Sequence, residues 1–338
     1  MSRRRTLLGL PVMVAVTMAS LTATAPAEPT TAHVPGDVHL ATFGIPGSTG
    51  VAHTVRRGDG SWTGFGYIGT NHSQRQLVSA IVDGEEHLIY EDYSGLPYRP
   101  SLHHRIRHAD GSWSEVTPGP VGTTGSTNDL AVAAVNGELH RVRRGSDDQL
   151  MKHAVRRADG TWASEVVVPA ATTATMNAAI AGVGDALRLV VDDTAGGRIL
   201  PSYVRYADGT WAQTADVPFT PAPAEVTATD VELAQVGSDL HALVIGSDGE
   251  VYHALQRPTG EWTTFTNVAS QTGAPGSAVN SASITASRGV LHVAVATDGD
   301  RLLHTIRSGD GRWLPFGDVL AANSSSPPRP LSITIAGS

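Results

Sequence analysis

The chain has 338 residues, no cysteine, only 5% aromatic residues and a formal net charge of −8 at neutral pH. The absence of cysteine excludes disulfides, zinc–thiolate sites, iron–sulfur clusters and cysteine nucleophiles. The acidic balance, with no basic stripe, argues against nucleic acid and anionic membrane surfaces as partners.

The N-terminus predicts an export signal. A basic region at residues 2–5 precedes an apolar stretch from Leu7 to about Leu21, and Ala25-Pro26-Ala27 supplies the small-x-small pattern of a cleavage site. We therefore expect a signal peptide over 1–27, a short linker over 28–36 and a mature chain with a charge near −11 (−8 − 3). The start also resembles a twin-arginine signal, so both export routes stay open. The apolar run is too short for a convincing membrane span, which predicts a secreted protein without one.

A repeat of about fifty residues covers the rest of the chain. All six tryptophans mark it, with spacings of 51, 49, 49, 51 and 51 residues: Trp62, Trp113, Trp162, Trp211, Trp262 and Trp313. A period of this length, with short strands, is typical of β-propeller blades. The spacing therefore predicts six blades.

Other residue types recur at fixed distances before each tryptophan. Glycine stands two residues before it in every copy, and aspartate three before it in five copies. Asp-Gly between alternating apolar segments predicts a tight hairpin turn, since both residues tolerate positive φ. Six before the tryptophan stands arginine in five copies, with Gln256 in the fifth: Arg56, Arg107, Arg156, Arg205 and Arg307.

Ten of the fourteen histidines occupy two further repeat positions. One lies nine residues before the tryptophan, with Ser202 in the fourth copy: His53, His104, His153, His253 and His304. The other lies 21 to 26 residues upstream, with Arg188 in the fourth copy: His39, His87, His140, His241 and His292. A position repeated around a ring indicates a structural role more than a metal ligand, so no metal site is predicted.

Each copy reads as four strands, placed in the last copy at 283–286, 290–297, 301–308 and 313–319. The first of them is rich in small residues, which suits the crowded centre of a ring. The first copy begins at 37–40, already a second strand, and 331–337 supplies the strand that it lacks. We therefore predict an all-β fold: a single six-bladed β-propeller of four-stranded antiparallel blades over 37–338, closed by the C-terminal strand joining the N-terminal blade.

The motif of the fifth copy is Asp248-Gly249-Glu250-Val251-Tyr252-His253, followed by Gly260-Glu261-Trp262. It resembles the repeats of PLL-like, tectonin-type and fucose-binding propeller lectins, and the resemblance covers almost all of 37–337. It implies sugar pockets between blades. Each copy keeps only one tryptophan and the aromatic content is 5%, which departs from those families, whose pockets often draw on more than one aromatic residue per blade.

The candidate ligand-binding residues follow from these repeats. The six tryptophans could stack on sugar rings or pack between blades. The arginines at 56, 107, 156, 205 and 307 could bind sugar hydroxyls or brace the turns through the aspartates. An insertion at 91–100 adds Tyr93, Tyr98 and Arg99 as a recognition surface.

Acidic residues gather on the face that carries the long loops, among them Glu91, Asp92, Asp148 and Asp192, with Asp147 and Asp193 beside the last two. They could bind calcium, act as paired glycosidase carboxylates, or be solvated turn residues. No catalytic motif is specific enough to predict an enzyme, and apart from calcium no cofactor is expected.

The sequence thus favours a secreted, lectin-like protein that binds glycans or cell-surface polysaccharide, multivalently if several copies work. Two alternatives stay open: a glycoside hydrolase or lyase with acids on the loop-rich face, and a secreted protein-binding scaffold.

Overall fold

A computed structural model describes residues 34, 36–44, 50–68, 74–92, 101–118, 130–145, 148–169, 175–193, 197–221, 225–323 and 330–337. The predicted signal peptide and most of the predicted linker lie outside this part of the chain. Among the described residues, no helix has the length and apolar character needed to cross a membrane.

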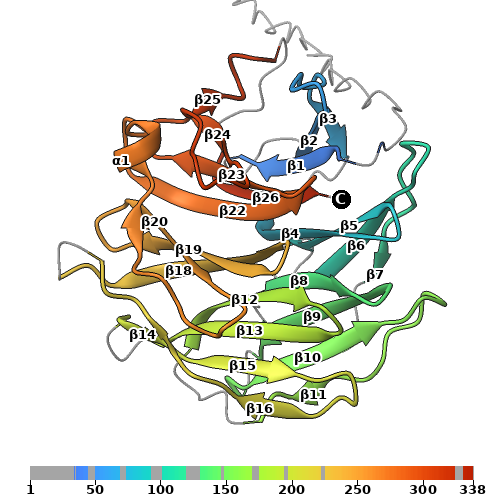
Figure 1. The fold of residues 1–338 in the computed structure, drawn as a ribbon. Helices are drawn as coiled ribbons and strands as arrows, with labels where there is room; N and C mark the ends of the chain where they lie inside the picture. Colours follow the sequence, from blue (N-terminus) through green and yellow to red (C-terminus); the bar gives the residue numbers. More distant parts are fainter. Residues whose placement is uncertain are drawn as a thin grey trace, which may run out of the picture.

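Six four-stranded antiparallel sheets form the six blades of a β-propeller. Strands β26, β4, β8, β12, β18 and β22 border its centre (Figure 1). The first three blades are β26 (Ser332–Gly337), β1 (Val38–Phe43), β2 (Val51–Arg56) and β3 (Gly66–Ile68); β4 (Gln74–Val82), β5 (Glu85–Asp92), β6 (Ser101–Arg107) and β7 (Thr117–Pro118); and β8 (Leu130–Val135), β9 (Glu138–Arg144), β10 (Met151–Arg156) and β11 (Val166–Val167).

The other three blades are β12 (Thr175–Val183), β13 (Ala186–Asp193), β15 (Ser202–Arg205) and β16 (Trp211–Gln213); β18 (Ala228–Val236), β19 (Asp239–Gly246), β20 (Val251–Gln256) and β21 (Thr266–Asn267); and β22 (Val279–Ser287), β23 (Val290–Thr297), β24 (Leu302–Arg307) and β25 (Gly317–Asp318). A single turn of helix, α1 (Ala269–Thr272), follows β21.

The two ends of the chain meet in the first blade, as the sequence predicts. Strand β26 pairs with β1 over six residues, from Val38 opposite Gly337 to Phe43 opposite Ser332. The hydroxyl of Thr334 accepts a hydrogen bond from the backbone of Ser79 in β4, while Ser283 in β22 accepts one from the backbone of Ile335. The last strand therefore lies between its two neighbours around the axis.

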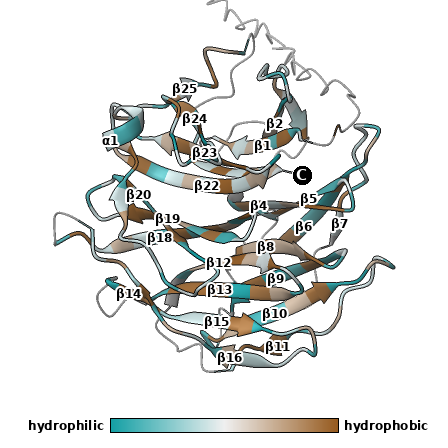
Figure 2. Cartoon of the chain, in the orientation of Figure 1, coloured by the Kyte–Doolittle hydropathy of each residue, from teal (hydrophilic) through white to brown (hydrophobic). Residues whose placement is uncertain are grey.

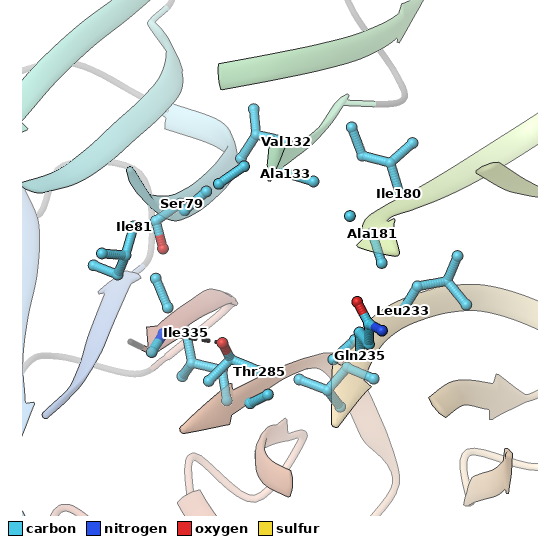
Figure 3. A pocket seen from close by; sticks show the side chains of 18 residues that line it. Ser79, Ile81, Val132, Ala133, Ile180, Ala181, Leu233, Gln235, Thr285 and Ile335 are labelled. Carbon is cyan, nitrogen blue, oxygen red and sulfur yellow. Dashed lines mark hydrogen bonds between the residues drawn. The ribbon is translucent and has the colours of Figure 1, made fainter. Parts of the chain in front are cut away.

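The inner strands line an axial channel. Their C-terminal halves, rich in alanine and other small residues, surround a cavity of about 260 Å³. Figure 3 shows side chains such as Ser79, Ala181 and Thr285 arranged around this opening. Small side chains at this radius let six strands approach one axis, which confirms the interpretation of these segments as innermost strands.

The core lies between successive blades. Figure 2 shows hydrophobic residues distributed along the strands with polar residues among them. One of the apolar clusters joins Leu139 of the third blade to Ile89 and Leu102 of the second. Because each cluster takes residues from two blades, no blade buries its faces alone.

The Asp-Gly turn differs in detail from the expected hairpin turn. In the first blade the amide of Gly60 donates to the carbonyl oxygen of Arg57, and only the glycine has positive φ, at 92°. Asp59 instead accepts hydrogen bonds from the amide and hydroxyl of Ser61 through its side chain. The geometry is a type I turn followed by a left-handed glycine, with the aspartate acting as a side-chain cap.

The fourth strands are shorter than expected. In five blades the tryptophan makes only an isolated bridge to the residue six before it, and the regular strand begins three or more residues later. In the fourth blade Trp211 itself opens β16. The irregularity of this blade lies before its third strand, where Pro201, which lacks an N–H, ends the short strand β14 (Ile199–Leu200) before β15 begins. Strand β14 pairs with β17 (Val217–Pro218) in a separate small sheet.

Candidate functional site: the seams between blades

The recurring residues of the sequence meet where two blades touch, in an interface that we call a seam and number by its two blades. In seam 2–3, His87 of β5 and His104 of β6 lie in the second blade, with 3.0 Å between Nδ1 and Nε2. Trp162 of the third blade meets His104 edge to face, with 6.1 Å between ring centroids. Two blades therefore supply each cluster.

The histidine pair repeats in seams 3–4, 5–6 and 6–1, with nitrogen–nitrogen distances of 2.9 to 3.1 Å. Its rings are buried. Burial, reinforced by a nearby arginine, lowers the pKa of His87, His140, His241 and His292 to about 4. The partners are lower still: the pKa of His104 and of His153 is about 3. These histidines are neutral hydrogen-bonding core residues, as the structural interpretation predicts.

Tryptophan packs on these histidines in five seams. The ring planes lie at 72 to 89° to each other, in the pairs Trp62–His304, Trp113–His53, Trp162–His104, Trp211–His153 and Trp313–His253. Packing between blades, one of the two interpretations of the tryptophans, is thus observed. Each indole stays half-exposed, and contact with a ligand stays a prediction.

The arginine six residues before each tryptophan is its cross-strand partner, so both side chains stand on the same side of the blade. A β-carbon at Gly60 would lie 3.3 Å from Nη2 of Arg56, and Arg156, Arg205 and Arg307 lie equally close to their own turn glycines. Gln256 replaces this contact with a hydrogen bond from Nε2 to the carbonyl of Gly260, 2.8 Å long. The guanidinium therefore covers its own hairpin turn.

Four of the five arginines keep part of their surface exposed, whereas Arg107 is fully buried. The pKa of His87 is lowered in part by Arg156, and that of His292 in part by Arg56. Each of these arginines thus lies close to the histidine pair of the preceding blade. A half-exposed guanidinium and a half-exposed indole stand side by side in blades 1, 3, 4 and 6.

Seam 4–5 departs from the pattern at all its polar positions. Arg188 and Ser202 replace the two histidines, and Gln256 replaces the arginine. The Nη2 of Arg188 lies 3.4 Å from Oε1 of Gln256 and 3.5 Å from the hydroxyl of Thr214. These long contacts replace the compact histidine pair.

Seam 1–2 contains a buried carboxylate that the sequence interpretation missed. Oε2 of Glu86 lies 2.9 Å from Nδ1 of His39 and 2.9 Å from Nε2 of His53. The two imidazoles lower the pKa of Glu86 far below its ordinary value, against the effect of burial. The signal was present in the sequence: the residue before the second-strand histidine or its equivalent is leucine in blades 3 to 6 and glutamate here.

The N-terminal halves of the inner strands form the polar end of the axial channel, a cavity of about 120 Å³. Asn177, Asp230, Glu232 and Ser281 line it. Burial, and secondarily the charge of Asp192, raise the pKa of Asp230 to about 7, and burial beside Asp230 raises that of Glu232 well above its ordinary value. Asp192, one of the acids that the sequence analysis placed on this face, thus lies near Asp230, which the sequence analysis did not name.

The other predicted loop acids are scattered. Asp148 is exposed and pairs with Lys152, with 2.8 Å between Nζ and Oδ2. Glu91 is buried in β5. The proposed recognition surface of Tyr93, Tyr98 and Arg99 lies outside the described residues, as do Asp147 and the side chains of Asp92 and Asp193.

No protein family profile matches the chain, and no curated protein does. Among solved structures, a lectin of Aleuria aurantia, described as six-bladed with a novel mode of fucose recognition, has a TM-score of 0.58 and 15% identity over 85% of this chain and 96% of its own. AofleA of Arthrobotrys oligospora has a TM-score of 0.57 and 12% identity over 92% of both chains. The BP39L lectin of Burkholderia pseudomallei has 0.56 and 15%, over 86% of this chain and 82% of its own.

This chain has the fold of these lectins. Identities this low establish the shared fold alone, and that fold is the one predicted from the tryptophan spacing. The six-bladed architecture and the resemblance to propeller lectins are therefore confirmed, whereas the candidate ligand-binding residues stay predictions.

Proposed function

We propose that this protein is a carbohydrate-binding propeller whose sugar sites lie at the solvent-exposed edges of the seams. The observation that carries the proposal is the recurring cross-strand pair of a half-exposed arginine and a half-exposed tryptophan. A guanidinium offers a fork of donors to sugar hydroxyls, and an indole offers an apolar face to the sugar ring. The lectin folds described above support this proposal by analogy.

The seams are not equal in this respect. Arg107 is buried in blade 2, and blade 5 has Gln256 in place of arginine. The pair is thus available in four blades, which carry Arg56, Arg156, Arg205 and Arg307. We propose four weak sites per chain, which would gain avidity on a polymer or a cell surface.

The test introduces into other blades the glutamine that blade 5 already has at the arginine position. Because Gln256 still braces its turn, Arg156→Gln removes the guanidinium while retaining the contact with the turn glycine. A glycan array that begins with fucosylated sugars identifies the ligand, and calorimetry then counts the sites. Each single Arg→Gln change in blades 1, 3, 4 and 6 should remove one site, and the fourfold variant should weaken binding at least tenfold.

The control is Arg157→Gln, which alters the neighbouring exposed arginine of the same turn and should leave the number of sites unchanged. A blank array, or a fourfold variant that binds sugar as the natural chain does, would refute the proposal. Thermal unfolding of each variant separates loss of a site from loss of the fold.

A second candidate function rests on the polar end of the channel. Asp230 and Glu232 are two residues apart on β18, so both face the cavity, and their raised pKa values suit a general acid that is protonated near neutral pH. If the protein cleaves a polysaccharide, Asp230→Asn should abolish the release of new chain ends without changing sugar binding at the seams. If the natural protein releases no chain ends from any polysaccharide that it binds, this candidate function is wrong.

We also propose that the protein is exported, on the basis of the signal-like residues 1–27. N-terminal sequencing of the protein recovered from the culture medium should give Glu28 as the first residue. Recovery of the full-length chain inside the cell would contradict this.

A further inference from the structure

The buried carboxylate of seam 1–2 stands where the repeat has an apolar residue. Glu86 occupies the position of Leu139, Leu187, Leu240 and Leu291 in the later blades, and all five side chains are buried. An ionised carboxylate loses several kcal/mol of hydration on burial, unless positive charge and hydrogen bonds replace it. The position of Glu86 therefore requires a cationic partner.

Two imidazole nitrogens converge on the same carboxylate oxygen. In four other seams Nδ1 of the second-strand histidine faces Nε2 of the third-strand histidine directly. In seam 1–2 the same two atoms, of His39 and His53, each lie 2.9 Å from Oε2 of Glu86. The side chains are at most 1% exposed, and all three ligand atoms lie within 4.8 Å of one another.

We propose that His39, His53 and Glu86 bind a divalent transition-metal ion, with Zn²⁺ as the best match. Two imidazole nitrogens and one carboxylate oxygen form a ligand set that zinc uses widely. Bonds of about 2.1 Å around a tetrahedral ion place ligand atoms about 3.4 Å apart. Each nitrogen–oxygen distance of 2.9 Å therefore has to lengthen by about half an ångström to accept the ion. The ion supplies the charge that the buried carboxylate requires.

Burial determines the role of this ion. With three protein ligands, a tetrahedral ion takes an enclosed water as its fourth ligand. A site closed to solvent offers no access to a substrate, so the metal is structural and enters as the chain folds. The ligands come from β1 and β2 of the first blade and β5 of the second, so the ion joins two blades in a protein that has no disulfides. The proposal does not depend on sugar binding.

In the competing explanation, protein side chains alone balance the charge of the carboxylate, without a metal ion. Arg107 is the register partner of Glu86 across β5 and β6 and is also buried, so a guanidinium and a protonated imidazole could balance the carboxylate. This arrangement predicts no metal binding. The two explanations are therefore distinguished by metal content alone.

The experiment unfolds the untagged protein with a chelator and refolds it with or without Zn²⁺. Native mass spectrometry after desalting should show one zinc per chain, and the melting temperature should rise by several degrees. Refolding with Co²⁺ should give the visible absorption of a low-symmetry cobalt site. Glu86→Leu, which introduces the residue of blades 3 to 6 and so suits the fold, should lose both the metal and the zinc-dependent shift.

The matched control is His292→Gln, which alters a histidine pair that has no carboxylate and should leave zinc binding unchanged. If the natural chain refolded with zinc retains none, or if Glu86→Leu retains as much zinc as the natural chain, the proposal is wrong. Circular dichroism of each refolded variant shows that the comparison is between folded proteins.

Discussion

The histidines that form the pairs of seams 2–3, 3–4, 5–6 and 6–1 contribute to stability only while they are neutral. The four described pairs with a direct ring contact have pKa values well below that of an exposed histidine, because burial penalises the charged ring and a neighbouring arginine adds repulsion. In the unfolded chain the same rings titrate near 6.5. Protonation is therefore linked to unfolding.

The sign of the resulting pH dependence follows directly. Above pH 6.5 both states are neutral and stability is at its full value; as the pH falls from 6.5 towards 4, only the unfolded state binds protons, and stability is lost. Each such histidine costs about 1.4 kcal/mol at pH 5.5. We expect the urea midpoint to fall steeply between pH 6.5 and pH 5. Changing His140 and His153 together to glutamine should reduce this slope, and an unchanged slope would show that the pairs are not its source.

The channel carboxylates have the opposite dependence. Burial raises the pKa of Asp230 to about 7, so its contribution to stability is present at low pH and is lost as the pH rises through 7. We expect Asp230→Asn to stabilise the protein at pH 8 by about 1 kcal/mol or more relative to pH 5. Thermal unfolding at both pH values measures the difference. Equal effects at the two pH values would show that Asp230 does not titrate in this range.

At the scale of the element, the hairpin turn before the tryptophan combines three separate requirements in blades 1, 3, 4 and 6. The glycine takes a left-handed φ, the aspartate caps the turn, and the arginine covers it. A β-carbon at Gly160 would lie 3.2 Å from Nη2 of Arg156, so a side chain would both strain the backbone and displace the guanidinium. The turn is therefore a packing element as well as a chain reversal.

We expect Gly160→Ala to lower the free energy of unfolding by about 1 to 2 kcal/mol, because an L-residue is disfavoured at a φ of 86°. Chemical denaturation measures the loss. Ala158→Ser, at an exposed position of the same turn, serves as the control and should change stability by less than about 0.5 kcal/mol. A loss no larger than that of the control would mean that the turn adapts to the side chain.

The strands were predictable to different extents. The second strand of the last copy was placed at 290–297 and is found there, since Gly289 and the following turn limit it in the sequence as in the structure. The fourth strand was predicted to begin at Trp313 but is confined to Gly317–Asp318, because the indole turns into the seam and only a single bridge pairs its backbone. The site was harder to predict: Glu86 breaks the repeat, but His39 and Glu86 are 47 residues apart, and the break alone does not show that one blade places a carboxylate beside the imidazoles of another.

At the scale of the whole molecule, a nearly regular ring has irregular seams. Regularity follows from the repeat, which made the six-bladed fold predictable from spacing alone. Irregularity comes from local replacements, such as Glu86 in seam 1–2 and Gln256 with Arg188 and Ser202 in seam 4–5, which change one seam and leave the others intact. The chemistry of each seam is therefore specified separately.

The ring depends on its last strand. Strand β26 buries Ile333, Ile335 and Ala336, and burial of such apolar side chains amounts to about 5 kcal/mol in total, comparable to the net stability of a domain. We expect a chain ending at residue 329 to lose cooperative unfolding in urea. Added peptide 330–338 should restore it, whereas a peptide with Ile333 and Ile335 changed to aspartate should not. Cooperative unfolding of the shortened chain without the peptide would contradict this expectation.

The pairing of β26 with β1 also determines when the first blade can be completed during synthesis. Strands β1 to β3 leave the ribosome first, yet their inner partner begins 264 residues (332 − 68) after β3 ends. At about 5 to 20 residues per second, the first blade waits roughly 15 to 50 s with the edge of β1 unpaired. The blade to which β1 belongs is thus completed after the other five, and any helper that shields a nascent chain has to cover the edge of β1 until β26 has emerged.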